Sequence, residues 1–255
     1  MSKLLIDAGT SWSKILEIYK DEKDLSESPM SEFSEIIEKY CIKNDKQSFS
    51  DNSGNLVNGR LFLLPTSIMT KMNLFFDGAT GHMVKNSVKP DGYYENELIA
   101  LGYGAKKMID DFENATIVDL GSRDIKWIKF ANGKFKDLDW NGTCGSATGA
   151  TVEMLGKFYN VDSSEISPQS EKIPVTCGVF AMEKIMDMII SDIPPDIAIA
   201  RYIHGIAYNT WNFAGQPEKI YLSGGFCANL CFIKSLKFYC ETVPLGRFAL
   251  LEGLF

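Results

Sequence analysis

The sequence predicts an α/β protein of two domains, and three observations support this fold class. Short apolar strands run into turns that contain glycine and then into a second strand or a helix, at residues 3–19, 116–130 and 219–239. The chain has 255 residues, which is enough for one large or two medium domains. With 45% hydrophobic and 23% charged residues, it has the composition of a globular protein that can bury a core.

We place the two domains at residues 1–115 and 116–255, with the last helix a candidate to pack back on the first domain. Residues 20–60 are polar, and we expect a short helix there, followed by a loop over 44–60. An "NGK" hairpin signal stands at 132–134. The spacing of apolar residues predicts further helices over four segments. These segments are 95–109, 145–159, 177–191 and 194–214.

The charge and the N-terminus exclude several classes of protein. The net charge of −7 argues against a nucleic-acid partner or an anionic membrane surface, because either would favour clustered Lys and Arg. The N-terminal "MSKLLIDAGT" has too few apolar residues for a signal peptide or a membrane span. We therefore expect a cytoplasmic protein, in which the six cysteines are reduced thiols, metal ligands or redox centres.

Three turns follow one design, in which an apolar strand delivers Asp or Ser into a glycine turn. They are Asp7-Ala8-Gly9-Thr10, Asp119-Leu120-Gly121-Ser122 and Ser223-Gly224-Gly225. Glycine lets backbone N–H groups approach phosphate oxygens, and a nearby carboxylate can hold Mg²⁺ directly or through water. Three such turns in this order suit a two-domain nucleotide clamp. Lys14 and Lys126 can reach phosphate or face solvent, and the sequence leaves both options open.

At these motifs the chain resembles the actin, sugar kinase and heat-shock ATPase superfamily, which has a ribonuclease H-like fold with a nucleotide cleft between two domains. The segments "IDAGTSWSKI", "IVDLGSRDIKWI" and "YLSGGFCANL" are similar to the phosphate and adenosine motifs of one branch. "NGTCGSATG" and "CGVFAMEKI" match two cysteine motifs of that branch. The chain thus resembles the 2-hydroxyacyl-CoA dehydratase activators and the related benzoyl-CoA reductase ATPase subunits, over most of its length apart from residues 20–60.

The resemblance implies an ATPase that is coupled to electron transfer in anaerobic metabolism. Each domain would be built on a mixed five-stranded sheet. Asp7 and Asp119 would position Mg²⁺ and the attacking water. The implied contacts with ATP or ADP are Gly9, Thr10, Ser11, Lys14, Gly121 and Ser122 at the phosphates, and Gly224, Gly225 and Asn229 along the adenosine.

The resemblance also implies a homodimer that shares one [4Fe–4S] cluster and passes an electron to a CoA-ester dehydratase or reductase. Cys144 and Cys177 stand in the two cysteine motifs. A cubane needs four thiolates and the motifs supply two per chain, so two chains would share it. A cysteine at a helix N-terminus has its thiolate favoured by the helix dipole. We expect Cys227, Cys231 and Cys240 to lie in the core or in the wall of a pocket.

The chain departs from this pattern at four positions. Ser122-Arg123 replaces Gly-Gln and puts a cation near the phosphates, Ala147 replaces a glycine, and Leu101 replaces a histidine. Two other functions therefore stay open. One is a small-molecule kinase of the same superfamily, in which Asp119 or Asp124 is the base that deprotonates a substrate hydroxyl. The other is a nucleotide-binding protein that does not hydrolyse its nucleotide.

Overall fold

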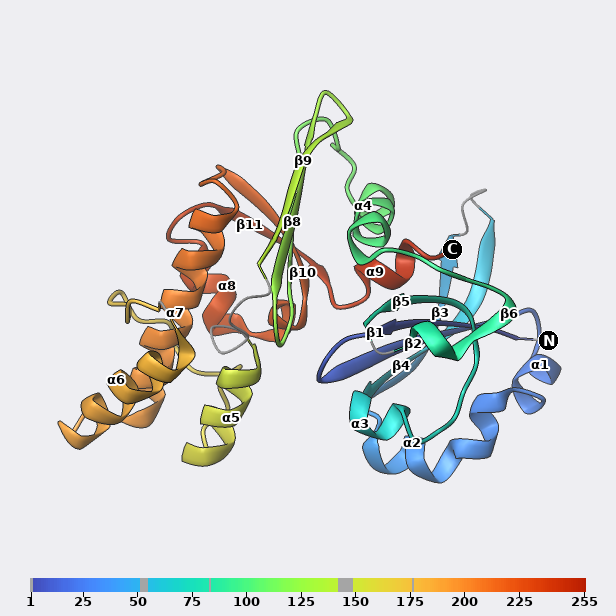
Figure 1. Ribbon diagram of the computed structural model, residues 1–255, viewed down its shortest axis with the longest axis horizontal. Helices are drawn as coiled ribbons and strands as arrows, with labels where there is room; N and C mark the ends of the chain where they lie inside the picture. The colour runs from blue at the N-terminus through green and yellow to red at the C-terminus, as the bar shows by residue number, and fades with distance from the viewer. Residues whose placement is uncertain (1, 51–54, 83, 142–148, 176) are drawn as a thin grey trace. The chain divides into compact units, whose positions relative to one another are not determined.

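The computed structural model describes residues 2–50, 55–82, 84–141, 149–175 and 177–255 (Figure 1). Its contacts divide the chain into two compact units. The first is Met1–Lys107 together with Phe248–Phe255, and the second is Met108–Arg247. The division therefore falls after Lys107 rather than after residue 115, and the end of the chain belongs to the first unit. The α/β fold class is confirmed, because each unit is built on a mixed sheet with helices.

The sheet of the first unit has six strands in the order β3-β4-β2-β1-β5-β6. Strands β1, β2, β4 and β3 are antiparallel neighbours, whereas β5 and β6 continue the sheet in parallel with β1. The strands are β1 (Lys3–Ala8), β2 (Trp12–Tyr19), β3 (Lys43–Ser50), β4 (Leu56–Pro65), β5 (Phe76–Gly81) and β6 (Val88–Tyr94).

The sixth strand corrects two expectations, since five strands and a loop over 44–60 were predicted. Residues 43–50 and 56–65 instead pair as an antiparallel ladder. Strand β3 lies at the sheet edge, and its side chains from Asn44 to Ser48 are exposed. An edge strand with polar and charged side chains is typical of proteins that avoid edge-to-edge aggregation. Such a strand lacks the alternation of apolar and polar residues, so its sequence pattern predicts a loop.

Both faces of the first sheet are covered. Leu4, Ile6 and Ala8 of β1 point to a core that includes Met30 and Ile37, whereas Leu5, between them, lies in a second core. This alternation is that of a strand buried on both faces. The helices of the unit are α1 (Glu22–Ser26), η1 (Pro29–Phe33), α2 (Ser34–Tyr40), α3 (Thr66–Met69), η2 (Lys85–Ser87), α4 (Glu97–Met108) and α9 (Ala249–Glu252).

Glycine allows α9 to pack closely on α4. A Cβ atom at Gly104 would lie 1.8 Å from the carbonyl oxygen of Ala249, and one at Gly253 would lie 1.9 Å from that of Ala100. Neither position has room for a side chain. The second core joins Leu251 and Leu254 of the chain end to Ala100 of α4, which explains why the last residues belong to the first unit.

The second unit repeats the strand pattern of the first. Its sheet has the order β11-β10-β7-β8-β9, in which β7, β8 and β9 are antiparallel and β10 and β11 run parallel to β7. The strands are β7 (Thr116–Leu120), β8 (Ile125–Ala131), β9 (Lys134–Asn141), β10 (Lys219–Gly224) and β11 (Glu241–Gly246). The predicted turn between β8 and β9 is confirmed, with φ of 52° at Asn132 and 68° at Gly133.

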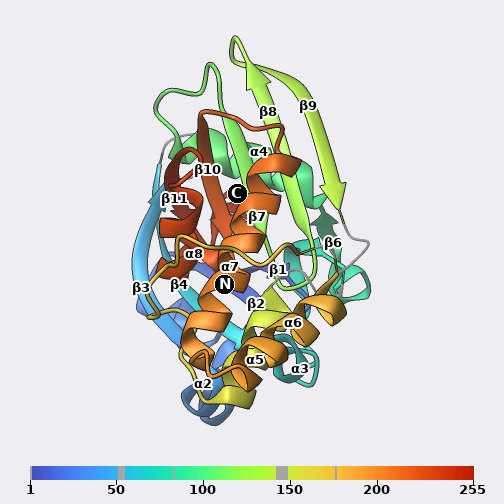
Figure 2. The same ribbon diagram turned by 90° about the vertical axis from the view of Figure 1, so that its left-hand side faces the viewer.

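The helices of the second unit pack around α7, as Figure 2 shows for α5 and α6. Tyr202, Ile203 and Ile206 of α7 are fully buried in the core of the unit. No helix among the described residues is long and apolar enough to span a bilayer. The helices are α5 (Gly149–Tyr159), α6 (Gly178–Ile190), α7 (Pro195–Phe213), η4 (Gly225–Ala228) and α8 (Leu230–Leu236). They match the helices predicted from spacing, except that 145–148 lie outside the described residues.

Candidate nucleotide site

The first candidate acid, Asp7, lies near the end of β1 and is paired with a lysine. Asp7 and Lys14 face each other across the β1–β2 hairpin, and Lys14 Nζ is 2.6 Å from Asp7 Oδ2. The two side chains are 5% and 14% exposed. Apolar neighbours on both faces of the sheet account for this burial, and the lysine charge compensates the buried carboxylate. The structure therefore places Lys14 on Asp7 and not in open solvent.

The backbone of the first turn is fixed from β4 and α3. Thr66 Oγ1 donates to the carbonyl oxygen of Gly9 at 2.7 Å and accepts from Ser13 Oγ at 2.9 Å. The Thr66 N–H donates to the carbonyl oxygen of Ser11 at 2.9 Å. Thr10, at the tip, is exposed. Sequence reasoning missed Thr66, because a threonine 57 residues from its partner leaves no local signal.

The end of β5 adds a histidine beside the first turn. Ala8 pairs with Gly81 in the parallel register of β1 and β5, so His82 follows the strand at the same edge as Gly9. His82 Nδ1 lies 2.8 Å from Glu97 Oε1. In open α/β sheets, ligands bind outside the carboxyl ends of the parallel strands. His82 and Glu97 are thus at the edge where a ligand of this unit is expected.

The second candidate acid, Asp119, is also buried and stands opposite a lysine, but its partner is different. Asp119 faces Lys126 across the β7–β8 hairpin. Its Oδ1 accepts a hydrogen bond from Ser223 Oγ at 2.7 Å. Lys126 Nζ also lies 2.9 Å from Asp124 Oδ1. The two hairpins thus place an acid at the same register, and Asp119 has in addition a serine hydroxyl donor from β10.

The second turn is closed by its own backbone and by the start of α5. The Gly121 N–H donates to the carbonyl oxygen of Asp124 at 3.1 Å. The N–H groups of Gly149 and Ala150 donate to the carbonyl oxygens of Gly121 and Ser122 at 3.2 and 3.0 Å. These bonds tie the candidate phosphate turn directly to the helix that follows the first cysteine motif.

Asp124 has both carboxylate oxygens engaged. Besides Lys126 on Oδ1, Trp140 Nε1 donates to Oδ2 at 3.1 Å, and the residue is 7% exposed. A base that must accept a substrate proton needs an oxygen within hydrogen-bond reach of that proton. Asp124 is therefore poorly arranged for the role that a small-molecule kinase would require.

The third turn requires glycine at its first position and has open space at its second. Gly224 has φ of 95°, and a Cβ there would lie 2.4 Å from the carbonyl oxygen of Leu120. At Gly225 a Cβ would meet nothing within 4 Å in the part of the chain that the structure describes. Asn229 caps α8, since its Oδ1 accepts from the Phe232 N–H at 2.8 Å and its Nδ2 donates to the Ser163 carbonyl oxygen at 2.9 Å.

Of the two candidate cluster ligands, only Cys177 lies in a described segment, because Cys144 falls within 142–148, outside the described residues. Cys177 is half-buried and is the N-cap of α6, where its side chain makes no capping hydrogen bond. The first turn of α6 contains no acidic residue. Within the described segments, no three His, Cys, Asp or Glu side chains are grouped as metal ligands.

The other thiols of the second unit are protonated and packed. Burial raises the pKa of Cys227 to about 12, and its Sγ donates to the Leu222 carbonyl oxygen at 3.0 Å. Burial likewise raises the pKa of Cys231 to about 11 and that of Cys240 above its ordinary value. A thiol is a metal ligand only as a thiolate, so these environments disfavour metal binding.

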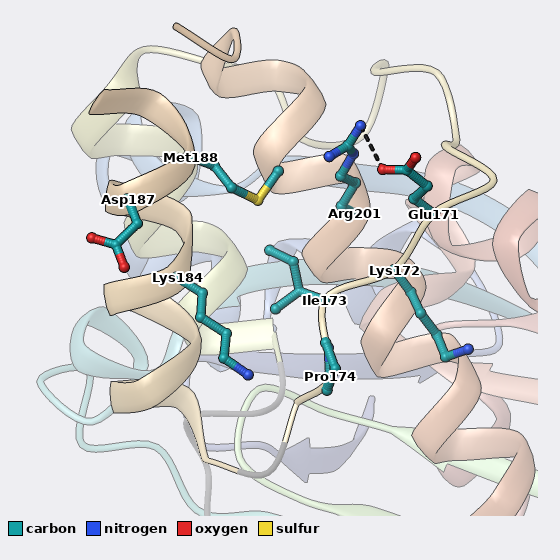
Figure 3. A pocket seen from close by; sticks show the side chains of 8 residues that line it. All are labelled: Glu171, Lys172, Ile173, Pro174, Lys184, Asp187, Met188 and Arg201. Atoms are coloured by element: carbon teal, nitrogen blue, oxygen red, sulfur yellow. Dashed lines mark ion pairs between the residues drawn. The ribbon is translucent and has the colours of Figure 1, made fainter. Parts of the chain in front are cut away.

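A separate hollow of about 320 Å³ lies in the second unit, between α6, α7 and the extended segment 171–174 (Figure 3). An ion pair of 2.7 Å joins Arg201 Nη2 to Glu171 Oε2 at this hollow. Its lining combines cationic, acidic and apolar side chains, so its charges favour neither an anionic nor a cationic ligand. The lining residues are Glu171, Lys172, Ile173, Pro174, Lys184, Asp187, Met188 and Arg201.

No family model matches the chain. Two curated proteins are similar in sequence. The chain is 26% identical to the (R)-2-hydroxyglutaryl-CoA dehydratase activating ATPase of Acidaminococcus fermentans over 204 residues, which cover 73% of this chain and 76% of that protein. It is 24% identical to the 2-hydroxyisocaproyl-CoA dehydratase activator of Clostridioides difficile over 134 residues, which cover 49% of this chain and 50% of that protein.

Two solved structures share the fold. One is the activator of the 2-hydroxyisocaproyl-CoA dehydratase from Clostridium difficile with bound ADPNP, which has a TM-score of 0.71, 17% identity and coverage of 100% of this chain and 92% of that one. The other is component A of the Acidaminococcus fermentans (R)-2-hydroxyglutaryl-CoA dehydratase, with a TM-score of 0.64, 18% identity and coverage of 100% and 95%. The expected resemblance to dehydratase activators is thus confirmed in sequence and in fold.

Proposed function

We propose that this chain is an ATP-dependent activator of a 2-hydroxyacyl-CoA dehydratase or of a related reductase. One observation carries the proposal. In both units, a hairpin holds a buried acid at the same register, Asp7 opposite Lys14 and Asp119 opposite Lys126, within a chain whose curated relatives are dehydratase activators. In this role, ATP hydrolysis drives a low-potential electron into the partner enzyme.

The nucleotide contacts in this proposal are the three turns. Backbone N–H groups of Gly9 to Ser11 and of Ser122 would bind phosphate oxygens, Gly121 would let the phosphate approach the turn closely, and the open side of Gly225 would face the adenosine. Asp7 and Asp119 offer carboxylate oxygens, which are the ligands that Mg²⁺ prefers. When bound, Mg²⁺ neutralises phosphate charge. Because Lys14 already compensates Asp7, we assign Asp7 to Mg²⁺ through a water molecule, and Asp119 to the attacking water.

The cluster in this proposal is held by Cys144 and Cys177 from each of two copies of the chain. Cys177 fits such a role, because it is half-buried at the start of α6 and its side chain is not used as a helix cap. The positive end of the helix dipole favours a thiolate there. When bound, the cluster supplies one-electron redox chemistry. Burial, which raises the thiol pKa of Cys227, Cys231 and Cys240, favours a packing role for these three residues.

The link between nucleotide and thiols is the start of α5. The N–H groups of Gly149 and Ala150 donate to carbonyl oxygens of the second turn; Gly149 is the last residue of the motif that contains Cys144, and Ala150 follows it. A shift of Gly121 and Ser122 on phosphate loss would therefore pull on the first turn of α5. Such a direct hydrogen-bonded connection is the physical form that coupling between two sites requires.

The decisive experiment is anaerobic iron–sulfur reconstitution of the purified chain. We expect a brown protein that absorbs at about 400 nm and contains about four irons per dimer. Cys144→Ser or Cys177→Ser should abolish the colour and leave ATP binding intact, whereas Cys227→Ser, the matched control, should keep it. Colour unaffected by serine at both motif positions would contradict the shared cluster.

The same preparation separates the activator from a kinase. A colourless protein that releases ADP only when a sugar or another small hydroxyl compound is added would support the kinase. An activator instead hydrolyses ATP without such a substrate, and its addition to a cognate dehydratase should give ATP-dependent dehydratase activity.

A further inference from the structure

Arg123 is the exposed cation of the second turn, and its charge is only loosely compensated. Its Nη2 is 3.7 Å from Asp124 Oδ2, which is beyond hydrogen-bond distance. Its Nε is buried, and no hydrogen bond to it is found among the described residues. The side chain is 40% exposed. A guanidinium group thus has donor capacity to spare next to a turn that contains Gly121 and Ser122.

The partner that would neutralise Arg123 is already occupied. Lys126 and the Trp140 indole donate to the two oxygens of Asp124 at 2.9 and 3.1 Å. Asp124 therefore already accepts two donors, and Arg123 Nη2 stays 3.7 Å away. The backbone that carries Arg123 is fixed by the Gly121 to Asp124 hydrogen bond and by the first amides of α5. Because its backbone is fixed and its charge is not fully compensated, the Arg123 guanidinium is well placed to bind an anion.

We propose that Arg123 binds phosphate oxygens of the nucleotide and supplies a charge that a glutamine at this position could not. The inference rests on the proposed binding of ATP or ADP at the three turns. A planar guanidinium matches phosphate with two parallel hydrogen bonds, which a lysine cannot reproduce. In this arrangement Arg123 offsets the negative charge of the phosphates.

The test is calorimetric titration of ATP, ADP and adenosine, with Mg²⁺ present, into wild type, Arg123→Gln and Arg123→Lys. A charged hydrogen bond corresponds to roughly 10- to 100-fold in affinity. We expect Arg123→Gln to weaken ATP and ADP by this factor and to change adenosine by less than about twofold. Arg123→Lys keeps the positive charge but lacks the planar guanidinium group. Its affinities for ATP and ADP should lie between those of wild type and Arg123→Gln.

Arg201→Gln is the matched control, because Arg201 also has a buried Nε with no hydrogen bond among the described residues and an acidic partner, Glu171. It lies at the hollow in Figure 3 and should leave all three affinities unchanged. Thermal unfolding checks that each variant is folded.

Three results would overturn the inference. ATP binding that is unchanged in Arg123→Gln would show that the side chain does not reach phosphate. Tighter binding would show that Arg123 obstructs the phosphates. A wild-type chain that binds neither ATP nor ADP would end both the inference and the proposed function, whereas normal wild-type binding with either of the first two results removes the role of Arg123 alone.

Discussion

Ser223 Oγ donates a hydrogen bond to Asp119 Oδ1 at 2.7 Å, although the two residues are 104 positions apart. The parallel register of β10 and β7 sets Ser223 directly beside Asp119. At the corresponding place of the first unit, Asp7 is held by Lys14 instead. Ser223 is a neutral donor, whereas Lys14 is a cation that offsets the negative charge of Asp7 without removing it. The two acids therefore differ in one of their immediate partners.

The first prediction concerns Ser223→Ala. Loss of a hydrogen bond to a buried carboxylate costs about 1.5–3 kcal/mol, and it frees Asp119 to rotate. We expect the rate of ATP hydrolysis to fall at least about tenfold with little change in ATP affinity, because only the orientation of Asp119 is altered. Steady-state kinetics and calorimetry measure the two effects separately.

Ser235→Ala is the control for this variant. Ser235 is fully buried in α8 of the same unit, beside the Cys231 thiol, so its hydroxyl is lost without disturbing Asp119. An ATPase rate that falls equally in both variants would indicate general loosening of the unit and not misorientation of Asp119.

The second prediction concerns the ion pair of Asp7 and Lys14. Removing one partner of a buried pair leaves an uncompensated charge and costs about 3–5 kcal/mol. Lys14→Gln should therefore lower the free energy of unfolding by about that amount, and the double variant Asp7→Asn/Lys14→Gln should recover most of it. Chemical denaturation of the four proteins gives this cycle.

Magnesium provides a further readout for the same residues. If Asp7 contributes to Mg²⁺ binding, Mg²⁺ with ATP should stabilise Lys14→Gln more than wild type, because the cation replaces the missing charge. Asp7→Asn should weaken Mg²⁺-dependent turnover more than nucleotide binding. The exposed pair of Lys219 and Glu241 is the control, and Lys219→Gln should have no measurable effect on unfolding.

The sequence predicted those parts of the structure that rest on local pattern. Apolar alternation followed by glycine located the three turns, and helical spacing located α4, α6 and α7. Strand β3 was missed because an exposed edge strand needs no apolar face. The predicted five-stranded sheet was therefore wrong for the first unit, while it holds for the second.

The partners of the candidate acids could not be predicted in the same way. Lys14 lies within the same hairpin as Asp7, so its proximity follows from the register alone. Ser223 and Thr66 reach their partners through the pairing of distant strands and helices, and no local pattern encodes that pairing. Lys126 stands opposite Asp119 in the second hairpin and also donates to Asp124, a contact that the sequence analysis did not predict.

The third prediction is a pH dependence of stability caused by His204. Burial lowers the pKa of His204, which lies between the Tyr239 hydroxyl at 2.7 Å from Nε2 and the Glu171 carbonyl oxygen at 3.2 Å from Nδ1. Because the folded-state pKa is below the unfolded value of about 6.5, the folded state favours the neutral ring. Stability is therefore full above this pH and is lost as the pH falls toward the folded-state pKa.

His204→Gln should flatten this part of the stability curve as the pH falls below the unfolded-state pKa of about 6.5. Denaturant titrations at a series of pH values measure the slope. The chain has two histidines, so His82→Gln removes the other one and separates the two contributions. An unchanged slope in His204→Gln would assign the pH dependence to other groups.

The last prediction separates the two glycines of the third turn. Gly224→Ala should destabilise the second unit by at least about 2 kcal/mol, because alanine at a φ of 95° is strained and its Cβ would approach the Leu120 carbonyl oxygen to 2.4 Å. Gly225→Ala should leave the protein as stable as wild type or slightly more so, because its Cβ meets nothing within 4 Å among the described residues and alanine restricts the unfolded chain.

For nucleotide binding, we expect the substitution at Gly225 to have a large effect although it leaves stability unchanged. Gly225 has open space in the structure, and the proposed function fills that space with adenosine, so a methyl group there should weaken ATP and ADP at least about tenfold in calorimetry. Inorganic triphosphate, which has no adenosine, should bind Gly225→Ala as it binds wild type. When Gly225→Ala unfolds at the same denaturant concentration as wild type, weaker binding cannot be attributed to unfolding. Unchanged ATP affinity in Gly225→Ala would mean that the adenosine does not pass along this turn, and the assignment of Gly224 and Gly225 would be wrong.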